Sequence, residues 1–144
     1  GCNFRCRWCQ NWEISQFPRA QHPVMGEKAS PEQIVSAARK AGSRSIAYTY
    51  TEPTVFFEFA LEVARQAHTA GLRNIFVTNG YMSAKALDML LPVLDAANVD
   101  LKSFSEAFYR DVCGARLAPV KTTVFLLSLI IVKCSAKCGA LNAP

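Results

Sequence analysis

Apolar residues along this chain alternate between helical spacing and short β-branched or aromatic runs. Ser30, Pro31 and Gln33 give the start signals of a helix, namely an N-cap, a proline in the first turn and the end of a capping box. An apolar stripe follows, and Gly42 ends it. The next run, residues 45–50, is short and rich in β-branched and aromatic residues, so it predicts a strand.

The same alternation continues along the chain. Helical spacing recurs over residues 56–67, 83–91 and 105–114, and strand-like runs occupy residues 73–78 and 98–102. Strands and helices that alternate at a spacing of about 25 residues indicate repeated βα units and a parallel sheet. The pattern therefore predicts an α/β fold.

Two stretches fall outside this alternation. Residues 13–28 are polar and interrupted by prolines and a glycine, which predicts an irregular surface connection with His22 exposed on it. Residues 124–132 form an apolar run of nine, whereas a transmembrane helix needs roughly 20. We expect this run to be a buried strand or helix segment.

Polar residues follow each predicted strand at its carboxyl end. They are Thr51-Glu52-Pro53, Thr78-Asn79-Gly80 and Asp100-Leu101-Lys102. In βα barrels the reactive groups gather at these ends of the strands. The sequence therefore predicts a polar pocket at this edge of the sheet.

Composition allows one ordinary core in 144 residues, with 51% hydrophobic and 19% charged residues. The net charge of +5 invites a nucleic-acid partner. Up to Asp111, however, there are 12 basic and 11 acidic residues, and the last quarter holds four basic residues and no acidic one. The excess charge is not a basic face of the folded body, so no nucleic-acid partner is expected.

Cys2, Cys6 and Cys9 form a C-x3-C-x2-C motif in the first nine residues. Thiolates select zinc, copper(I) or iron–sulfur clusters. Structural zinc and an ordinary [4Fe–4S] cluster each take four ligands, whereas three local thiols suit a cluster with one open iron. A zinc site completed by His22, Cys113, Cys134 or Cys138 is the alternative, and disulfides fit the spacing poorly.

The cysteine motif and the residues after it, Gln10-Asn11-Trp12-Glu13, resemble the signature of radical S-adenosylmethionine (radical SAM) enzymes. Within that superfamily the chain looks like the pyruvate formate-lyase-activating-enzyme-like branch, and most like the radical SAM member of the AmmeMemoRadiSam system. The resemblance implies a partial (βα)6 TIM-like barrel. This chain would be a fragment of it, with the first strand before Gly1 and the last strands after Val120.

The resemblance also implies a cofactor site. Cys2, Cys6 and Cys9 would ligate three irons of a [4Fe–4S] cluster, and SAM would chelate the fourth iron. Glu52 would receive the SAM amino group, Asn79 and Gly80 would form a ribose- or methionine-binding turn, and Asp100 and Lys102 would contribute to the SAM and substrate site. Each group also has a purely structural alternative. Glu52 would be a helix-start carboxylate, Asn79 and Gly80 an ordinary Asn-Gly turn, and Asp100 and Lys102 a buried ion pair.

The activity implied by the resemblance is reductive cleavage of SAM to methionine and a 5′-deoxyadenosyl radical, which then takes hydrogen from a substrate. A flavodoxin or ferredoxin would supply the electron, and a glycyl-radical protein is a candidate substrate. We expect a reducing, cytoplasmic location and no membrane partner. The rival hypotheses are an inactive radical SAM remnant and a zinc-stabilised binding module.

Residues 1–120 are predicted to be the incomplete radical SAM core, and residues 121–144 an atypical tail. The resemblance stops after Val120, acidic residues disappear, and Cys134 and Cys138 occur without a supporting pattern. This combination is typical of a shifted or misassembled reading frame. The two cysteines alone are a weak indication of a second metal site.

Overall fold

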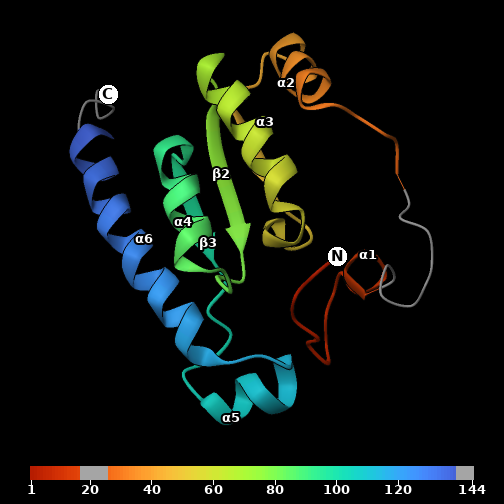
Figure 1. Cartoon of the computed structure of the whole chain (residues 1–144), viewed down its shortest axis with the longest axis vertical. Helices are drawn as coiled ribbons and strands as arrows, with labels where there is room; N and C mark the ends of the chain where they lie inside the picture. The colour runs from red at the N-terminus through yellow and green to blue at the C-terminus, as the bar shows by residue number, and fades with distance from the viewer. Residues whose placement is uncertain (17–25, 139–144) are drawn as a thin grey trace, which may run out of the picture.

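A computed structural model of the chain describes residues 1–16 and 26–138, with side chains described as far as residue 129. His22 lies outside the described residues. The elements follow one another as βα units, preceded by an N-terminal loop and two helices (Figure 1).

Three parallel strands form the sheet, in the order β1 (Ser45–Tyr48), β2 (Arg73–Thr78) and β3 (Ala96–Val99). Ser45 pairs with Arg73, and Ile75 pairs with Ala96. Strand order therefore follows chain order. The predicted α/β fold with parallel strands is confirmed, and the sheet is consistent with part of a radical SAM TIM-like barrel.

Helices connect the strands and cover the sheet. A 3-10 turn, η2 (Pro53–Phe56), and α3 (Phe57–Thr69) join β1 to β2, and α4 (Ala84–Leu90) with η3 (Leu91–Val93) joins β2 to β3. Helix α2 (Pro31–Lys40) packs on α3 and begins with the predicted capping box. Ser30 N donates to Gln33 Oε1 at 2.8 Å, and Gln33 N donates to Ser30 Oγ at 3.3 Å.

The main core lies between the sheet and these helices. Its most buried apolar side chains come from α3, α4 and β2. They include Ala60, Ala64, Leu90 and Phe76. Asn74 is fully buried there, but it accepts from Tyr48 Oη and donates to the carbonyl oxygens of Ala64 and Val93. A buried amide with all its partners costs the core little stability.

A second apolar cluster lies under the N-terminal loop. Phe4 packs there with residues from α5 (Glu106–Phe108), the π-helical turn η4 (Tyr109–Cys113) and the start of α6 (Leu117–Cys138). Gly114 ends η4 in the left-handed conformation with φ 66°, a geometry that glycine adopts without strain. This cluster attaches the cysteine motif to the last third of the barrel fragment.

Three predicted elements need correction. Residues 13–16 are not irregular but belong to a short helix, α1 (Trp12–Gln16). Strand β3 spans 96–99 rather than 98–102, and β1 ends at Tyr48 rather than at residue 50. Asp100 and Lys102 therefore lie beyond the strand, in the segment that follows it.

Helix α6 continues through the predicted boundary after Val120, and residues 124–132 are helical. Thr123 and Leu127 are buried against the rest of the fold. Whether residues 121–144 come from a shifted reading frame stays a prediction.

Within the described ranges, no single helix is both long and apolar enough to cross a membrane. The helical segments 106–113 and 117–129 are long and apolar enough only when taken together, by length and composition alone, and a bend of 112° separates them. Several of their apolar side chains, including Tyr109 and Val120, are buried within the protein.

Candidate functional site

Backbone hydrogen bonds hold the cysteine loop in place from three directions. Cys2 N donates to Ser15 O at 3.0 Å, and Glu52 N donates to Gly1 O at 3.1 Å. On the other side, Arg5 N donates to Cys113 O at 2.7 Å. The loop is thereby joined to α1, to the end of β1 and to η4, and it faces the carboxyl ends of the strands (Figure 1).

Phe4 anchors the centre of the loop. Its side chain is 1% exposed, and its ring makes edge contacts with Tyr81 and Tyr109 at centroid distances of 5.4 and 5.9 Å. Trp8, by contrast, is 62% exposed and contacts Phe108 at 5.6 Å. Of the two aromatic residues beside the cysteines, Phe4 packs inward and Trp8 stands at the rim.

One cavity of about 340 Å³ brings most of the predicted site residues together. Its lining comes from the loop, the strand ends and η4. It includes Cys2, Cys6, Cys9, Glu52, Asn79, Asp100 and Lys102. The polar pocket predicted at the carboxyl edge of the sheet is therefore present in the fold.

The three thiols all line this cavity. Among the described side chains, residues 1–16 and 26–129, no three His, Cys, Asp or Glu side chains gather closely enough to hold one metal ion. A site for one metal ion is therefore not formed by these side chains. A four-iron cluster binds each thiolate at a different iron, so its ligands stand farther apart than those of one zinc ion. Three thiols around one cavity are ligands of the kind that such a cluster takes.

Each thiol has different neighbours. Cys2 Sγ accepts from Phe4 N at 3.4 Å and from Asn79 Nδ2 at 3.7 Å. Burial raises the pKa of Cys2, and the Phe4 amide partly offsets this. Cys9 Sγ lies 3.5 Å from Ser15 Oγ. Burial, together with the neighbouring Cys113, raises the pKa of Cys6 to about 11.

Cys113 is a fourth thiol in the same cavity. It is 1% exposed, as expected of a small buried cysteine, and it lies beside Cys6. The sequence names it as a candidate fourth ligand, but its place beside Cys6 depends on the fold. No spacing rule relates residues so far apart in the chain.

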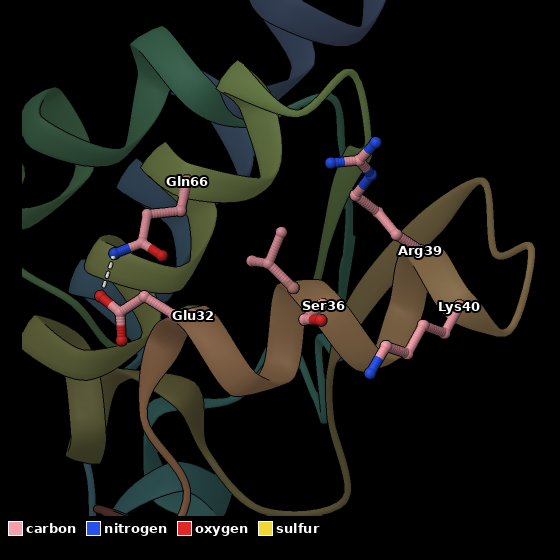
Figure 2. Close-up of a pocket in the computed structure, with 6 residues that line it drawn as sticks. Glu32, Ser36, Arg39, Lys40 and Gln66 are labelled. Carbon is pink, nitrogen blue, oxygen red and sulfur yellow. Dashed lines mark hydrogen bonds between the residues drawn. The ribbon is translucent and has the colours of Figure 1, made fainter.

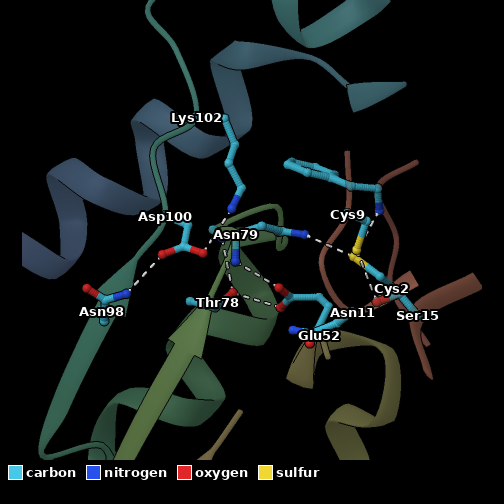
Figure 3. A network of polar contacts seen from close by, with 12 residues as sticks. Cys2, Cys9, Asn11, Ser15, Glu52, Thr78, Asn79, Asn98, Asp100 and Lys102 are labelled. Atoms are coloured by element: carbon cyan, nitrogen blue, oxygen red, sulfur yellow. Dashed lines mark hydrogen bonds and ion pairs between the residues drawn. The ribbon is translucent and has the colours of Figure 1, made fainter. Parts of the chain in front are cut away.

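Glu52 is buried, at 2% exposure, and it connects the ends of β1 and β2 (Figure 3). Its Oε1 accepts from Thr54 N at 3.1 Å, Thr54 Oγ1 at 2.5 Å and Thr78 Oγ1 at 2.7 Å. Its Oε2 accepts from Asn79 N at 2.8 Å. The carboxylate thus caps η2, as the structural alternative expected, and it also lines the cavity.

Asn79 and Gly80 form the turn after β2. Asn79 is nearly buried and points its side chain toward the cysteine loop (Figure 3). Gly80 has φ 73°, and an added Cβ would lie 2.8 Å from Val99 Cγ1. The observed geometry of Gly80 is that of a tight turn against β3, and Gly80 is not among the residues that line the cavity.

Asp100 and Lys102 form an ion pair with a 2.9 Å Nζ–Oδ2 distance. Both side chains are partly exposed, so the pair is not the buried one that the structural alternative described. Burial acts to lower the pKa of Lys102, but the bond and charge of Asp100 outweigh it, so that the pKa is raised. Lys102 is therefore a cation at the cavity wall.

Tyr50 lines the cavity with a strained backbone that the sequence does not indicate. Its φ is 72°, the left-handed region that favours glycine, and its side chain is 74% exposed. Asn11 Nδ2 donates to Tyr50 O at 2.8 Å, which ties this conformation to the segment after the cysteines. Strained residues of this kind concentrate at functional sites.

A second hollow, of about 540 Å³, lies between α2 and α3 (Figure 2). Its lining consists of Glu32, Val35, Ser36, Arg39, Lys40 and Gln66. Gln66 Nε2 donates to Glu32 Oε1 at 2.9 Å across it. None of the predicted site residues lies there, so the larger hollow is not the one with the candidate chemistry.

Comparison with known proteins gives a consistent match to one superfamily. Residues 1–127 match the sequence profile of the radical SAM superfamily. The chain is 46% identical over 123 residues to an uncharacterized protein of Methanocaldococcus jannaschii, which covers 85% of this chain and 35% of that protein.

Two relatives with named activities are more distant. A 7-carboxy-7-deazaguanine synthase of Thermococcus kodakarensis is 27% identical over 137 residues, covering 85% of this chain and 54% of the synthase. A GTP 3′,8-cyclase of Aeromonas hydrophila is 26% identical over 124 residues, covering 78% of this chain and 34% of the cyclase. The chain thus spans between about a third and a half of the length of these relatives.

Proposed function

Because the chain belongs to the radical SAM superfamily, we propose that it is part of an enzyme that cleaves SAM reductively. The observation that supports this best is the single cavity lined by three loop thiols and by the polar ends of the strands. Thiolates suit an iron–sulfur cluster, and the polar groups opposite them suit a charged small molecule.

Cys2, Cys6 and Cys9 would hold a [4Fe–4S] cluster by three irons, with the fourth iron left for SAM. When bound, the cluster supplies the electron that splits SAM into methionine and a 5′-deoxyadenosyl radical. The protein's own part is to bind the thiolates in place and to limit water at the site. Phe4 serves the second purpose because its buried ring fills the space under the loop.

The polar residues of the cavity would bind the amino-acid end of SAM. Lys102 is a cation at the wall and would neutralise the SAM carboxylate. Glu52 would accept from the SAM ammonium group through Oε2, which takes one protein hydrogen bond, while Oε1 takes three. Asn79 and Gly80 would support the ribose or methionine portion as a turn.

For the whole protein we propose the pyruvate formate-lyase-activating-enzyme-like branch, on the strength of the motif in residues 1–16. An electron donor such as flavodoxin or ferredoxin and a glycyl-radical protein as substrate follow from that assignment. So does a reducing, cytoplasmic location.

One observation favours a second candidate, a zinc-stabilised binding module. Cys113 brings a fourth thiol into the cavity beside Cys6. Four thiolates are a common ligand set of structural zinc. Among the described side chains no three of them gather closely enough for one ion, so the cysteine loop would have to draw in when zinc binds. In that case the chain would hold zinc and would have no affinity for SAM.

The test is anaerobic reconstitution of the chain with iron and sulfide. We expect about four iron and four sulfide per chain, a brown protein and SAM-dependent changes in its spectrum. 5′-Deoxyadenosine formed after chemical reduction would show cleavage of SAM. Zinc without iron would support the binding module, and a cluster without SAM cleavage would support the inactive remnant.

A further inference from the structure

We propose that Asn79 is a positioning residue that raises the reduction potential of a cluster bound at Cys2, by donating a hydrogen bond to its sulfur. This inference rests on the proposed function, because it needs a cluster on Cys2. The contact that carries it is the 3.7 Å approach of Asn79 Nδ2 to Cys2 Sγ (Figure 3).

The neighbours of Asn79 fix which end of its amide faces the sulfur. Asn79 Oδ1 accepts from Tyr81 N at 2.8 Å, so the oxygen is turned away from the loop. Asn79 Nδ2 donates to Asn3 Oδ1 at 2.7 Å. The orientation of Asn3 is fixed in turn, since its Nδ2 donates to Tyr81 O at 2.9 Å. A flipped Asn79 amide would set oxygen against oxygen and N–H against N–H.

The backbone of Asn79 is held as firmly as its side chain. Its amide nitrogen donates to Glu52 Oε2 at 2.8 Å, and both residues are nearly buried. Glu52 also accepts from Thr78 Oγ1, the residue just before Asn79. Moving the backbone that carries the donor away from Cys2 would therefore break a buried carboxylate network.

The other two loop thiols have different surroundings. Cys9 Sγ faces the hydroxyl of Ser15, and Cys6 lies beside Cys113. Cys2 receives two N–H groups, one from Asn79 and one from Phe4. Reduction adds negative charge to a cluster and its thiolates, so N–H donors at the sulfur stabilise the reduced form more than the oxidised form. Asn79 should therefore shift the potential upward.

The experiment is potentiometric titration, followed by electron paramagnetic resonance, of the reconstituted chain and two variants. Asn79→Asp keeps an oxygen for Tyr81 N but replaces the donor with a carboxylate oxygen. Asn79→Ala removes the side-chain contacts altogether. Gln66→Ala is the matched control, because it removes an amide on α3 whose contacts are Glu32 and Glu62.

We expect both Asn79 variants to retain iron and to have a more negative midpoint potential, with the control unchanged. The reduction equilibrium should fall by up to about tenfold, which is 59 mV for a one-electron couple. The carboxylate of Asn79→Asp adds repulsion, so this variant should shift further than Asn79→Ala.

Unchanged potentials with iron retained would overturn the inference and leave the proposed function standing. Loss of iron from both variants would show that Asn79 serves to hold the cysteine loop, and this result would also overturn the inference. If only Asn79→Ala loses iron, the inference is judged on Asn79→Asp: a more negative midpoint potential supports it, and an unchanged potential overturns it. A wild-type chain that takes up no cluster would instead overturn the proposed function itself.

Discussion

The backbone nitrogen of Arg5 lies 2.7 Å from the carbonyl oxygen of Cys113, so the loop with the three candidate ligands is fastened to a fourth cysteine. The two segments are more than a hundred residues apart in the chain. Cys113 consequently lies beside Cys6 in the cavity, although the motif contains three cysteines. This pairing sets the first prediction.

Cys6→Ala should abolish cluster assembly, whereas Cys113→Ala should retain it. Cys6 would be one of three ligands, and the remaining thiols cannot replace it at its own iron. Iron and sulfide analysis of the reconstituted variants measures the difference. If Cys113→Ala loses its metal as fully as Cys6→Ala does, four thiols form one closed site, and a closed cluster or the zinc module is the better assignment.

Glu52→Gln should destabilise the fold by about 1–3 kcal/mol. Both oxygens of Glu52 accept hydrogen bonds, so the new NH2 group must face an N–H or O–H donor. Urea unfolding at constant m-value checks this. Glu62→Gln, at an exposed position on α3, is the control and should have little effect. Equal stabilities for the two variants would contradict a structural role for Glu52.

Gly80→Ala should cost more stability than Gly42→Ala, although both glycines have positive φ. The backbone penalty of about 1–2 kcal/mol applies to each. At Gly80 the new Cβ also comes within 2.8 Å of Val99 Cγ1, whereas nothing lies within 4 Å at Gly42. Overpacking adds about 1–3 kcal/mol at Gly80 alone. Chemical denaturation of both variants tests the ranking, and equal losses would show that the turn has room.

Phe4→Ala should reduce stability by about 3–5 kcal/mol, because it empties the apolar cluster under the loop. Trp8→Ala is the matched comparison, since it removes a larger ring that is 62% exposed. Its cost should be about 1 kcal/mol or less, mostly the contact with Phe108. Thermal or urea unfolding measures both. A larger loss for Trp8→Ala would mean that the loop is anchored at its rim.

The sequence predicts local elements well where the start and end signals are strong. The capping box of Ser30 and Gln33 and the parallel strand at residues 73–78 appear as expected. The predicted bounds of β3 are wrong because Val99 and Leu101 continue the apolar alternation. The ladder nevertheless ends at Val99, and Lys102 N donates instead to Tyr109 Oη. A long-range hydroxyl contact of that kind leaves no trace in local periodicity.

The candidate site, too, could be predicted from the sequence only in part. The strand-end rule is enough to place Glu52, Asn79, Asp100 and Lys102 around one cavity. It cannot say that Glu52 is already bonded through both oxygens, or that Asn79 faces a sulfur. Those facts depend on side-chain orientation and on the docking of a distant loop.

The left-handed backbone of Tyr50 has a consequence for engineering this protein. A glycine at position 50 would relieve a conformational cost of about 1–2 kcal/mol, because it adopts this φ freely. The tyrosine ring, being 74% exposed, contributes little to the core in return. A library selected for heat resistance alone would therefore drift toward glycine at this position, and a selection that depends on the cavity rim would keep the aromatic ring.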